Sequence, residues 1–499
     1  MRAVIAPYVN AHPSRVGVPR KVCEGMTVPI KVTSWNKKAV EIIIQDKKAL
    51  FATNLENERI DLRLHPDPGK LEVGWVVDRL LKQDDIVLLN RQPTLSRRSK
   101  IALRVDVLNN DAVLRLPLQL TTNFNADFDG DEMNMHVPQT VEARAEAEAL
   151  MSAEHTVINT ASGLASVVPV QGDRLGAYLM TDPQRSLTRR QWFVCLGWAS
   201  GDILERAQKS PPSAFPCRAS ELFSLALPEL YNWKGAGVEI LRGKLISGRV
   251  GAKVLRQLVH DIWHDRGAGA PLDFVHGVNR VAGAFNSLFP TTITLEEVSN
   301  TRESQRECDA ILAREQEYVA RVLSMASLTA EKKQRVVREA MSRASRDIAE
   351  YVFDHSSKKH TGFRDLVLSK AKGSKLNFGM VLGCLGKMLS SNDVEGGFTP
   401  IEGAATAQRR CFTTRSGKEP FQDAFVTSGY SRGMTLEQYA VHSKAGRIGL
   451  IDSANKVGKV GYQYRRVSTM CEALCARNGS VFDTSNNMVV SWKYGDDGR

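Results

Sequence analysis

Two short segments with alternating apolar residues, separated by a turn, constrain the fold of this chain most strongly. Over residues 101–107 every second residue is Ile, Leu or Val, and over residues 114–120 every second residue is Leu. Asn109-Asn110-Asp111, between them, is typical of a turn. A period of two places the apolar side chains on one face of a strand. We therefore predict two half-buried strands joined by a tight turn, as part of a small β-barrel.

An acidic segment follows the second predicted strand directly. Residues 123–134 read NFNADFDGDEMN, so Asp127, Asp129 and Asp131 recur at a spacing of two. This spacing puts the three carboxylates on one side of an extended segment, and Gly130 lets the chain curl so that they converge. Carboxylates this close repel one another unless a cation neutralises them. Hard oxygen ligands with room for water and phosphate suit Mg²⁺.

Polar residues of these kinds also have other interpretations. Most acidic clusters of this kind are solvated turns, and the triplet alone leaves that interpretation open. An EF-hand loop is excluded, because its twelfth position should be Glu and the twelfth residue from Asp127 is Pro138. A metallohydrolase site at His260 and His264 is disfavoured, because a zincin needs Glu after its first His. We interpret these two as ordinary histidines on a helix face.

Basic residues lie close to the acidic segment in the sequence. Residues 90–95, NRQPTL, follow a short apolar strand at 86–89, and Arg97, Arg98 and Lys100 come next. Cations beside a magnesium loop suit a nucleoside triphosphate or a nucleic-acid backbone, although surface salt bridging is the alternative for each one singly. The whole chain of 499 residues carries a formal net charge of +12. This balance favours polyanionic partners, or a basic protein with solvated Lys and Arg.

Helical patterns dominate the middle of the chain. Thr140 is a suitable N-cap for a helix over residues 141–151. Residues 294–352 are highly charged, with apolar positions at helical spacing, and predict a pair of long surface helices broken near 327–329. Residues 356–376 are basic and predict a loop.

A long stretch without proline lies near the C-terminal end. Thr435-Leu436-Glu437-Gln438 is a capping-box pattern, and Asn478-Gly479 is a stop signal. The roughly 40 residues between them would span about 60 Å as one helix. Four glycines interrupt this stretch, and each costs about 1 kcal/mol relative to Ala: Gly446, Gly449, Gly458 and Gly461. Periodicity alone favours two ordinary helices with a kink, and the alternative is one basic strut that crosses a cleft.

The eight cysteines and the hydropathy pattern limit the cellular setting. No Cys-x-x-Cys pair occurs, so a zinc ribbon is not expected, and the cysteines predict buried thiols in a reducing compartment. Cys471 and Cys475, one helical turn apart, are expected to share a helix face. No apolar run approaches the roughly 18 residues of a membrane span, and the N-terminus does not resemble a signal peptide. We predict a soluble, intracellular protein.

Two motifs together resemble the largest subunit of multisubunit DNA-directed RNA polymerases. Residues 125–134, NADFDGDEMN, match the signature of that family at every position, and residues 90–95 match its upstream nucleotide-binding motif. The resemblance extends over nearly the whole chain, with an archaeal, eukaryotic or viral rather than bacterial spelling. Further similar segments are 16–19, 27–29, 32–36, 136–139, 142–146, 370–375, 449–452, 461–466 and 494–498.

This resemblance implies a mixed α+β fold with a double-psi β-barrel at its catalytic core. It also overturns the two-helix interpretation of the long C-terminal stretch. The domains that it implies are an approach (dock) region at 1–72, the barrel at 73–140, a pore region at 141–290, funnel helices at 291–355, a basic connecting region at 356–433, a bridge helix at 434–478 and the start of the next region at 479–499.

The resemblance also implies a site and a reaction. Asp127, Asp129 and Asp131 match the ligands of the catalytic Mg²⁺, while Arg91 and Asn125 match the residues that read the ribose of the incoming nucleotide. The RNA 3′-hydroxyl would attack the α-phosphate, and a second Mg²⁺ would arrive with the triphosphate. The basic residues expected to contact nucleic acid are Lys370, Lys372, Lys375, Lys456, Lys459, Arg465 and Arg466.

The chain departs from the family pattern in three places. It starts after the zinc-bearing clamp head and ends before the trigger loop, so we expect a split or truncated subunit that does not polymerise alone. The family's Thr-Ala pair in the bridge helix is here Val457-Gly458. The implied partners are the second-largest subunit, separate chains with the clamp head and the trigger loop, the DNA template, the RNA product and nucleoside triphosphates, with no membrane. The alternatives are a non-catalytic scaffold paralogue and an RNA-templated polymerase relative.

Overall fold

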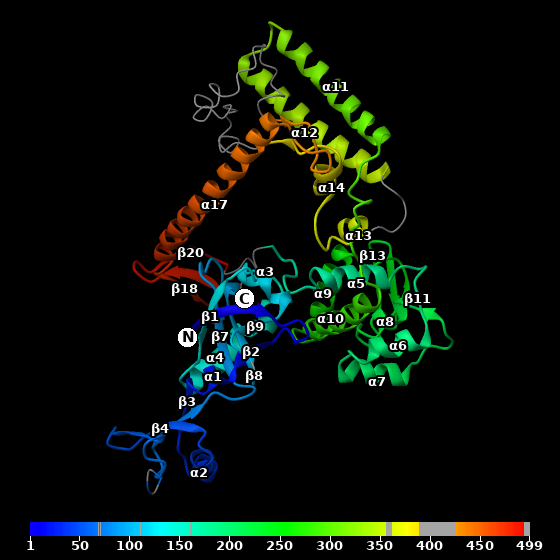
Figure 1. Cartoon of the computed structure of the whole chain (residues 1–499). Coiled ribbons are helices and arrows are strands. Elements are labelled where there is room, and N and C mark those ends of the chain that lie inside the picture. Colours follow the sequence, from blue (N-terminus) through cyan, green and yellow to red (C-terminus); the bar gives the residue numbers. More distant parts are fainter. Residues whose placement is uncertain are drawn as a thin grey trace. The chain divides into compact units, whose positions relative to one another are not determined.

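The chain divides into two compact units (Figure 1). The first comprises Met1–Thr294 and Lys359–Ser374, and the second comprises Leu295–Lys358 and Lys375–Arg499. Both units mix helices with strands, as predicted for an α+β protein. The computed structural model describes residues 1–67, 69, 71–109, 111–159, 162–355, 362–388 and 425–493.

A closed barrel of six strands forms the first part of unit 1 (Figure 1). Closure pairs every strand on both sides and leaves no open sheet edge. Its strands, in spatial order, are β1 (Arg2–Pro7), β10 (Glu132–His136), β7 (Ile86–Asn90), β8 (Lys100–Leu108), β2 (Arg15–Pro19) and β9 (Leu114–Leu116). Val16, Leu89, Val105 and Leu114 are completely buried inside it. This barrel fits the double-psi architecture that the sequence predicted.

The predicted hairpin of β8 and β9 is wrong, because β2 lies between the two strands. β2 runs parallel to β8, with Val16 opposite Val105, and antiparallel to β9, with Gly17 opposite Arg115. The space at Gly17 is tight, since an added Cβ would lie 2.7 Å from the Arg115 Cβ. The second alternating run is also shorter than predicted, because β9 ends before Pro117 and the chain turns into the 3-10 helix η2 (Leu118–Leu120).

The barrel also extends beyond the predicted boundaries. β1 and β2 come from residues 2–19, which were assigned to the approach region, because strand pairing in this barrel joins distant segments. A separate four-stranded sheet follows in the order β3 (Thr27–Lys31), β6 (Val76–Leu80), β4 (Ala49–Thr53) and β5 (Arg59–Asp61). Helix α2 (Lys37–Gln45) contributes Val40 to the small core of this sheet. The sheet crosses the predicted boundary at residue 72.

The rest of unit 1 is mainly helical. Its largest helices share one apolar core with the barrel. As predicted, the Thr140 hydroxyl caps the first of them by accepting a hydrogen bond from the Ala143 N–H. The helices are α1 (Arg20–Cys23), η1 (Arg97–Ser99), α3 (Thr121–Phe124), α4 (Val141–Met151), η3 (Ala153–Thr156), α5 (Gly172–Met180), α6 (Arg189–Leu196), α7 (Gly201–Lys209), α8 (Ser220–Ser224), α9 (Ala252–Arg266), α10 (Ala270–Leu288) and α13 (Gly362–Leu368). The strands are β11 (Ser186–Leu187) with β12 (Cys217–Arg218), and β13 (Trp233–Gly235), β14 (Val238–Leu241) and β15 (Lys244–Ser247) in one sheet.

Unit 2 contains the predicted pair of long helices, α11 (Arg302–Ser324) and α12 (Ala330–His355). The Arg343 guanidinium on α12 donates hydrogen bonds to the buried Glu315 carboxylate on α11, at 2.7 Å for Nη2. The remaining elements are α14 (Lys375–Leu382), β16 (Gly386–Lys387) paired with β17 (Phe425–Val426), α17 (Leu436–Met470), and a sheet of β18 (Leu474–Arg477), β19 (Ser480–Asp483) and β20 (Met488–Ser491).

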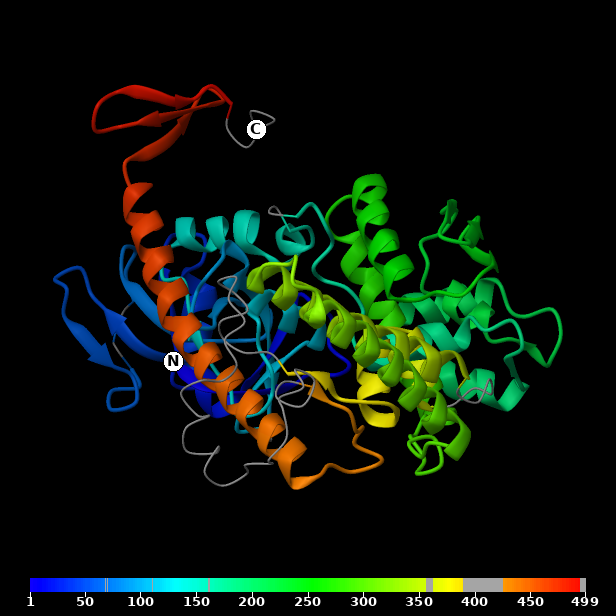
Figure 2. The same ribbon diagram turned by 90° about the horizontal axis from the view of Figure 1, so that it is seen from above.

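Helix α17 is one continuous helix of 35 residues, so the two-helix interpretation is wrong (Figure 2). Its capping box is confirmed, with Thr435 and Gln438 bonding each other's backbone N–H groups. It ends at Met470, earlier than predicted. Asn478-Gly479, which was predicted to stop the helix, instead forms the turn between β18 and β19. Both turn residues have positive φ, +50° and +74°, as a two-residue hairpin requires.

Three further expectations can be compared with the structure. Cys471 and Cys475 are exposed and do not share a helix face, because the helix ends between them, whereas Cys23, Cys195, Cys217, Cys308 and Cys384 are buried. The region 356–376 is not only a loop, because α13 and the start of α14 lie in it. Residues 494–498 and most of 356–433 lie outside the described residues.

No helix in the described part of the chain is long and apolar enough to cross a membrane.

Candidate metal and nucleotide site

The acidic loop connects α3 to β10 and brings its three Asp side chains together. One carboxylate oxygen from each of Asp127, Asp129 and Asp131 lies within 4.8 Å of the others. The loop starts at Asn125, which ends α3 in the left-handed conformation with a φ of +48°. Gly130 follows in the loop with a φ of +127°, a backbone conformation that favours Gly. Within the described residues, no other three His, Cys, Asp or Glu side chains are grouped in this way.

Asp131 is held in a fixed orientation. Its Oδ2 accepts hydrogen bonds from Arg91 Nε at 2.8 Å and from the Asp127 backbone N–H at 3.1 Å. Its backbone carbonyl accepts from the Ile5 N–H of β1 at 3.0 Å, which ties it to the barrel. The Arg91 guanidinium, above all, lowers the pKa of Asp131 below its ordinary value. Asp131 is therefore an anion whose Oδ1 takes no part in these bonds.

Asp127 has the opposite electrostatic behaviour. A hydrogen bond with the Asp129 carboxyl raises its pKa, and partial desolvation and the charges of Asp129 and Asp131 raise it further. Both Asp127 and Asp129 are exposed. Negative charge therefore accumulates at one exposed point, and the Arg91 guanidinium that binds Asp131 offsets part of it. A divalent cation fits this donor set, because it would relieve the repulsion between the carboxylates.

Arg91 reaches the acidic loop because its strand is a neighbour of β10 in the barrel. β7 ends at Asn90, which lies opposite Asn134 of β10 and opposite Lys100 of β8. The Asn90 Oδ1 accepts a hydrogen bond from the Thr94 hydroxyl at 2.7 Å, which closes the turn after Arg91. The motif at 90–95 and the Asp loop are thus brought together by strand pairing, although they lie about 40 positions apart in the sequence.

Asn125 combines two properties. Its left-handed backbone is a C-cap conformation that Gly adopts best and Asn adopts next best. It is exposed and precedes Asp127 by two residues. Asn125 therefore has a local backbone role in α3, whatever its side chain binds.

The predicted nucleic-acid contacts are divided between the units. Lys370 and Lys372 belong to unit 1, where the Lys370 carbonyl accepts a hydrogen bond from Arg174 at 3.3 Å. Lys375 belongs to unit 2, where its Nζ lies 3.7 Å from the Asp354 carboxylate and 4.8 Å from the centre of the Phe353 ring. Lys375 thus has a structural role in addition to any contact with phosphate.

The other predicted nucleic-acid contacts are the cations of α17. Lys456, Lys459, Arg465 and Arg466 are all exposed. Lys456 pairs with Asp452 one turn earlier, and the Arg466 guanidinium lies 5.7 Å from the Tyr462 ring centre. At each of the four glycines of α17 an added Cβ would meet nothing within 4 Å, so packing against the described residues does not explain them.

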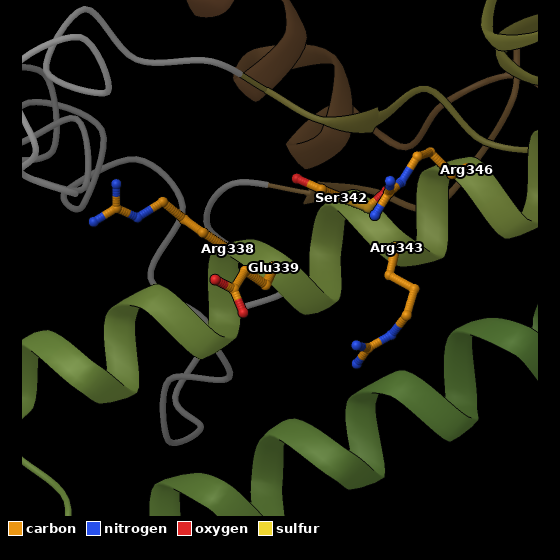
Figure 3. A pocket seen from close by; sticks show the side chains of 5 residues that line it. All are labelled: Arg338, Glu339, Ser342, Arg343 and Arg346. Atoms are coloured by element: carbon orange, nitrogen blue, oxygen red, sulfur yellow. The ribbon is translucent and has the colours of Figure 1, made fainter.

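Figure 3 shows a separate basic cavity of about 330 Å³ on α12, lined by Arg338, Glu339, Ser342, Arg343 and Arg346. The Arg343 side chain points toward α11, where Glu315 binds it. The sequence analysis did not single out these residues. All of them come from one helix of unit 2, and none belongs to the Asp loop, so the cavity is not part of the candidate site.

The two histidines set aside in the sequence are also accounted for. His260 and His264 lie on one face of α9, with ring centres 4.6 Å apart. The His260 Nδ1 lies 3.1 Å from an Asp261 carboxylate oxygen. This arrangement is that of ordinary helix-face histidines, as predicted.

Comparison with known proteins bears directly on this site. Residues 1–153, which include the barrel, Arg91 and the Asp loop, match the family described as RNA polymerase Rpb1, domain 2. Residues 433–498, which include α17, match RNA polymerase Rpb1, domain 5. The chain is therefore related to the largest subunit of DNA-directed RNA polymerase. Lys370, Lys372 and Lys375 lie outside both matched segments.

A curated relative is similar to this chain over the chain's full length. The chain is 29% identical to DNA-directed RNA polymerase subunit Rpo1N of Methanothermobacter thermautotrophicus over an alignment of 547 residues. The alignment covers 100% of this chain and 60% of Rpo1N, so the chain spans less than two thirds of that relative's length. The archaeal origin of this relative is consistent with motif sequences that resemble archaeal, eukaryotic or viral rather than bacterial subunits.

Two buried polar residues connect the segment before the Asp loop to the helices of unit 1, and the sequence analysis did not identify them. Gln119 and Asp173 are both buried and hydrogen-bonded to each other, which links η2 to α5. A sequence signal for Gln119 exists, because it is a single amide within the apolar run LPLQL at 116–120. Asp173 gives no such signal, because Asp is common in the first turn of a helix.

Proposed function

We propose that this chain performs nucleotidyl transfer, as the metal-binding part of a multisubunit RNA polymerase that copies DNA into RNA. One observation carries the proposal: three convergent carboxylates and an arginine lie beside the ends of two neighbouring strands, β10 and β7, of a closed barrel in a chain related to the polymerase largest subunit. The activity of the whole enzyme is inferred for this chain from that arrangement and that kinship.

The proposed cofactor is Mg²⁺, held by Asp127, Asp129 and Asp131, with a second Mg²⁺ arriving with the triphosphate. When bound, such ions activate the attacking hydroxyl and stabilise the charge on the leaving pyrophosphate. Asp131, already ionised and oriented by Arg91, offers its Oδ1 as the most preorganised ligand.

Arg91 is proposed to serve both the carboxylate and the nucleotide. A guanidinium has five N–H donors, so the single Nε bond to Asp131 leaves capacity for sugar or phosphate oxygens. Its fixed position at the end of β7 would place these donors beside the reacting groups without reorganisation.

We predict that the Asn125 amide contributes to selection of ribose over deoxyribose. Asn125→Ser and Asn125→Gly should both lower the preference of the assembled enzyme for ribonucleotides, by about tenfold if one hydrogen bond of about 1.4 kcal/mol is lost. Gly accepts the left-handed backbone at this position, so it tests the amide without strain in α3. Single-nucleotide incorporation with matched NTP and dNTP measures the effect. Unchanged discrimination in Asn125→Gly would refute the role.

We predict that the lysines at 370–375 contact phosphates of the template. Neutralising Lys370, Lys372 and Lys375 together should weaken duplex binding. It should also make the slope of the logarithm of the binding constant against the logarithm of salt concentration shallower by up to about 2.7, at about 0.9 per lost contact. Lys375→Gln alone should have the smaller effect, since Lys375 already has Asp354 as a neighbour. Template binding by the assembled complex at several salt concentrations measures the slope. An unchanged slope in the triple variant would mean that these charges are only solvated.

The remaining assignments rest on the resemblance. We propose that α11 and α12 are the funnel helices, that α17 is the bridge helix and that residues 141–290 form the pore region. The proposed partners are the second-largest subunit, chains with the clamp head and trigger loop, DNA, RNA and nucleoside triphosphates. The exposed cations and glycines of α17 support close approach of a nucleic-acid strand to that helix.

Primer extension with DNA and RNA templates tests the proposed function. The complex assembled from this chain and its partner subunits should extend RNA on DNA in a magnesium-dependent reaction. Extension on RNA alone would identify an RNA-templated polymerase, and no extension from a fully assembled complex would identify a scaffold paralogue.

A further inference from the structure

A buried carboxyl group joins the segment before the Asp loop to two helices. Asp173, in the first turn of α5, is 8% exposed, and its Oδ2 accepts a hydrogen bond from Gln119 Nε2 of η2 at 3.0 Å. Its Oδ1 accepts from Asn279 Nδ2 of α10, also at 3.0 Å. Gln119 and Asn279 are 1% and 3% exposed, so the whole network is inside the protein.

The two helices that hold this network form a rigid support. An added Cβ at Gly176 of α5 would lie 2.7 Å from the Ala282 Cβ of α10, so the helices touch closely at that point. The Asn286 Nδ2 of α10 also donates to the Gly172 carbonyl at 2.8 Å. Small displacements of Asp173 relative to Asn279 are therefore resisted by packing.

The chain between Gln119 and the metal site is short and tightly turned. Asp127 follows Gln119 by eight positions, and the Ala126 N–H donates to the Thr121 carbonyl at 2.9 Å across the end of α3. Midway, the buried Asn123 Nδ2 donates to the Thr156 hydroxyl at 3.4 Å. The side chains of Gln119 and Asn123 thus fix the entry to the Asp loop from inside the protein.

We propose that Asp173 is a positioning residue for the metal loop, acting through Gln119 to hold the entry segment against α5 and α10. It does not contact the substrate or the metal ligands. The inference rests on the proposed function, because the geometry that it maintains is that of Asp127, Asp129 and Asp131.

The electrostatics of Asp173 supply a distinct signature. Burial raises its pKa to about 6, against the opposing effects of the bonds from Gln119 and Asn279, the Val170 backbone and the charge of Arg174 on its own helix. The side chains that η2 and α10 present to it are uncharged amides. Because its folded pKa is raised, Asp173 stabilises the fold fully below its ordinary pKa, and this stability is lost as the pH rises through about 6.

An Asn at this position should keep the network without the charge. Gln119 Oε1 and Asn279 Oδ1 are buried and have no hydrogen-bond partner among the described residues. Rotation of one of these amides would let the new amide side chain of the Asp173→Asn variant accept one bond and donate another. In contrast, Asp173→Leu cannot bridge the two amides.

The test compares variants in the assembled complex. Asp173→Leu should raise the half-saturating Mg²⁺ concentration for single-nucleotide incorporation by about tenfold or more, the range found for residues that orient metal ligands. Asp173→Asn should recover most of this loss. Ser287→Ala, which removes an exposed hydroxyl of α10 and leaves Gln119, Asp173 and Asn279 untouched, should behave like the wild type. If Asp173→Leu does not assemble, Gln119→Met breaks the same bond from the other end.

Two measurements are independent of catalysis. Mn²⁺ affinity of the complex should fall in Asp173→Leu and recover in Asp173→Asn, and the thermal stability of Asp173→Asn relative to wild type should rise as the pH increases through about 6. Wild-type Mg²⁺ and Mn²⁺ dependence in Asp173→Leu, or an equal loss in Ser287→Ala, would overturn the inference. A wild-type complex that incorporates no nucleotide would instead refute the proposed function, and Mn²⁺ affinity would then decide the role of Asp173.

Discussion

The assembled complex with Asp129→Ala should incorporate nucleotide about a hundredfold to a thousandfold more slowly than the wild-type complex. Assembly of the complex should be unchanged. Asp129 is exposed, so its removal costs little stability but takes away one of the three convergent carboxylates proposed to hold the metal. The magnitude is that of losing one preorganised electrostatic group at a reacting centre. Single-turnover incorporation on a primed template measures it.

Glu148→Ala is the matched control for this prediction. Glu148 is an exposed carboxylate on α4 that pairs with Arg104, outside the Asp loop. Exposed pairs of this kind contribute between about 0 and 1 kcal/mol, so activity should stay near wild type. Near-wild-type incorporation by Asp129→Ala would contradict the assignment of the catalytic ligands.

The isolated chain should incorporate no detectable nucleotide. Three carboxylates leave most of a magnesium coordination shell to water, so the metal affinity of the isolated chain should be poor. Helix α17 also exposes large apolar side chains, with Leu450 at 73% and Met470 at 75%, which predicts aggregation or chaperone binding without partners. Adding the second-largest subunit and a trigger-loop chain should restore magnesium-dependent synthesis. Primer extension by the purified chain alone would contradict this dependence.

Local sequence patterns predicted which residues face inward, but not which strands pair. The alternation at 101–107 correctly identified β8, and Leu114 and Leu116 are buried as expected. The insertion of β2 between β8 and β9 could not be predicted, because it depends on a parallel pairing with a segment almost 90 residues earlier. The capping box at Thr435 was a reliable helix start, whereas Asn478-Gly479 fits a helix end and a hairpin turn equally well.

The candidate site shows the same division. The Asp spacing and Gly130 were sufficient to predict convergence of the three carboxylates, because that geometry is local. The bond between Arg91 and Asp131 depends on the pairing of β7 with β10, so the sequence indicated proximity of cations but not their geometry. The supporting role proposed for Asp173 could not be predicted from a local sequence pattern, because it depends on the packing of α5 on α10.

Binding of Mn²⁺ to the assembled complex, followed by electron paramagnetic resonance, tests the central claim most directly. The wild-type complex should bind a Mn²⁺ ion that Mg²⁺ displaces, and Asp129→Asn should lose that ion while Glu148→Gln retains it. Equal stoichiometry and affinity in the wild type and in Asp129→Asn would show that the triplet does not hold the metal.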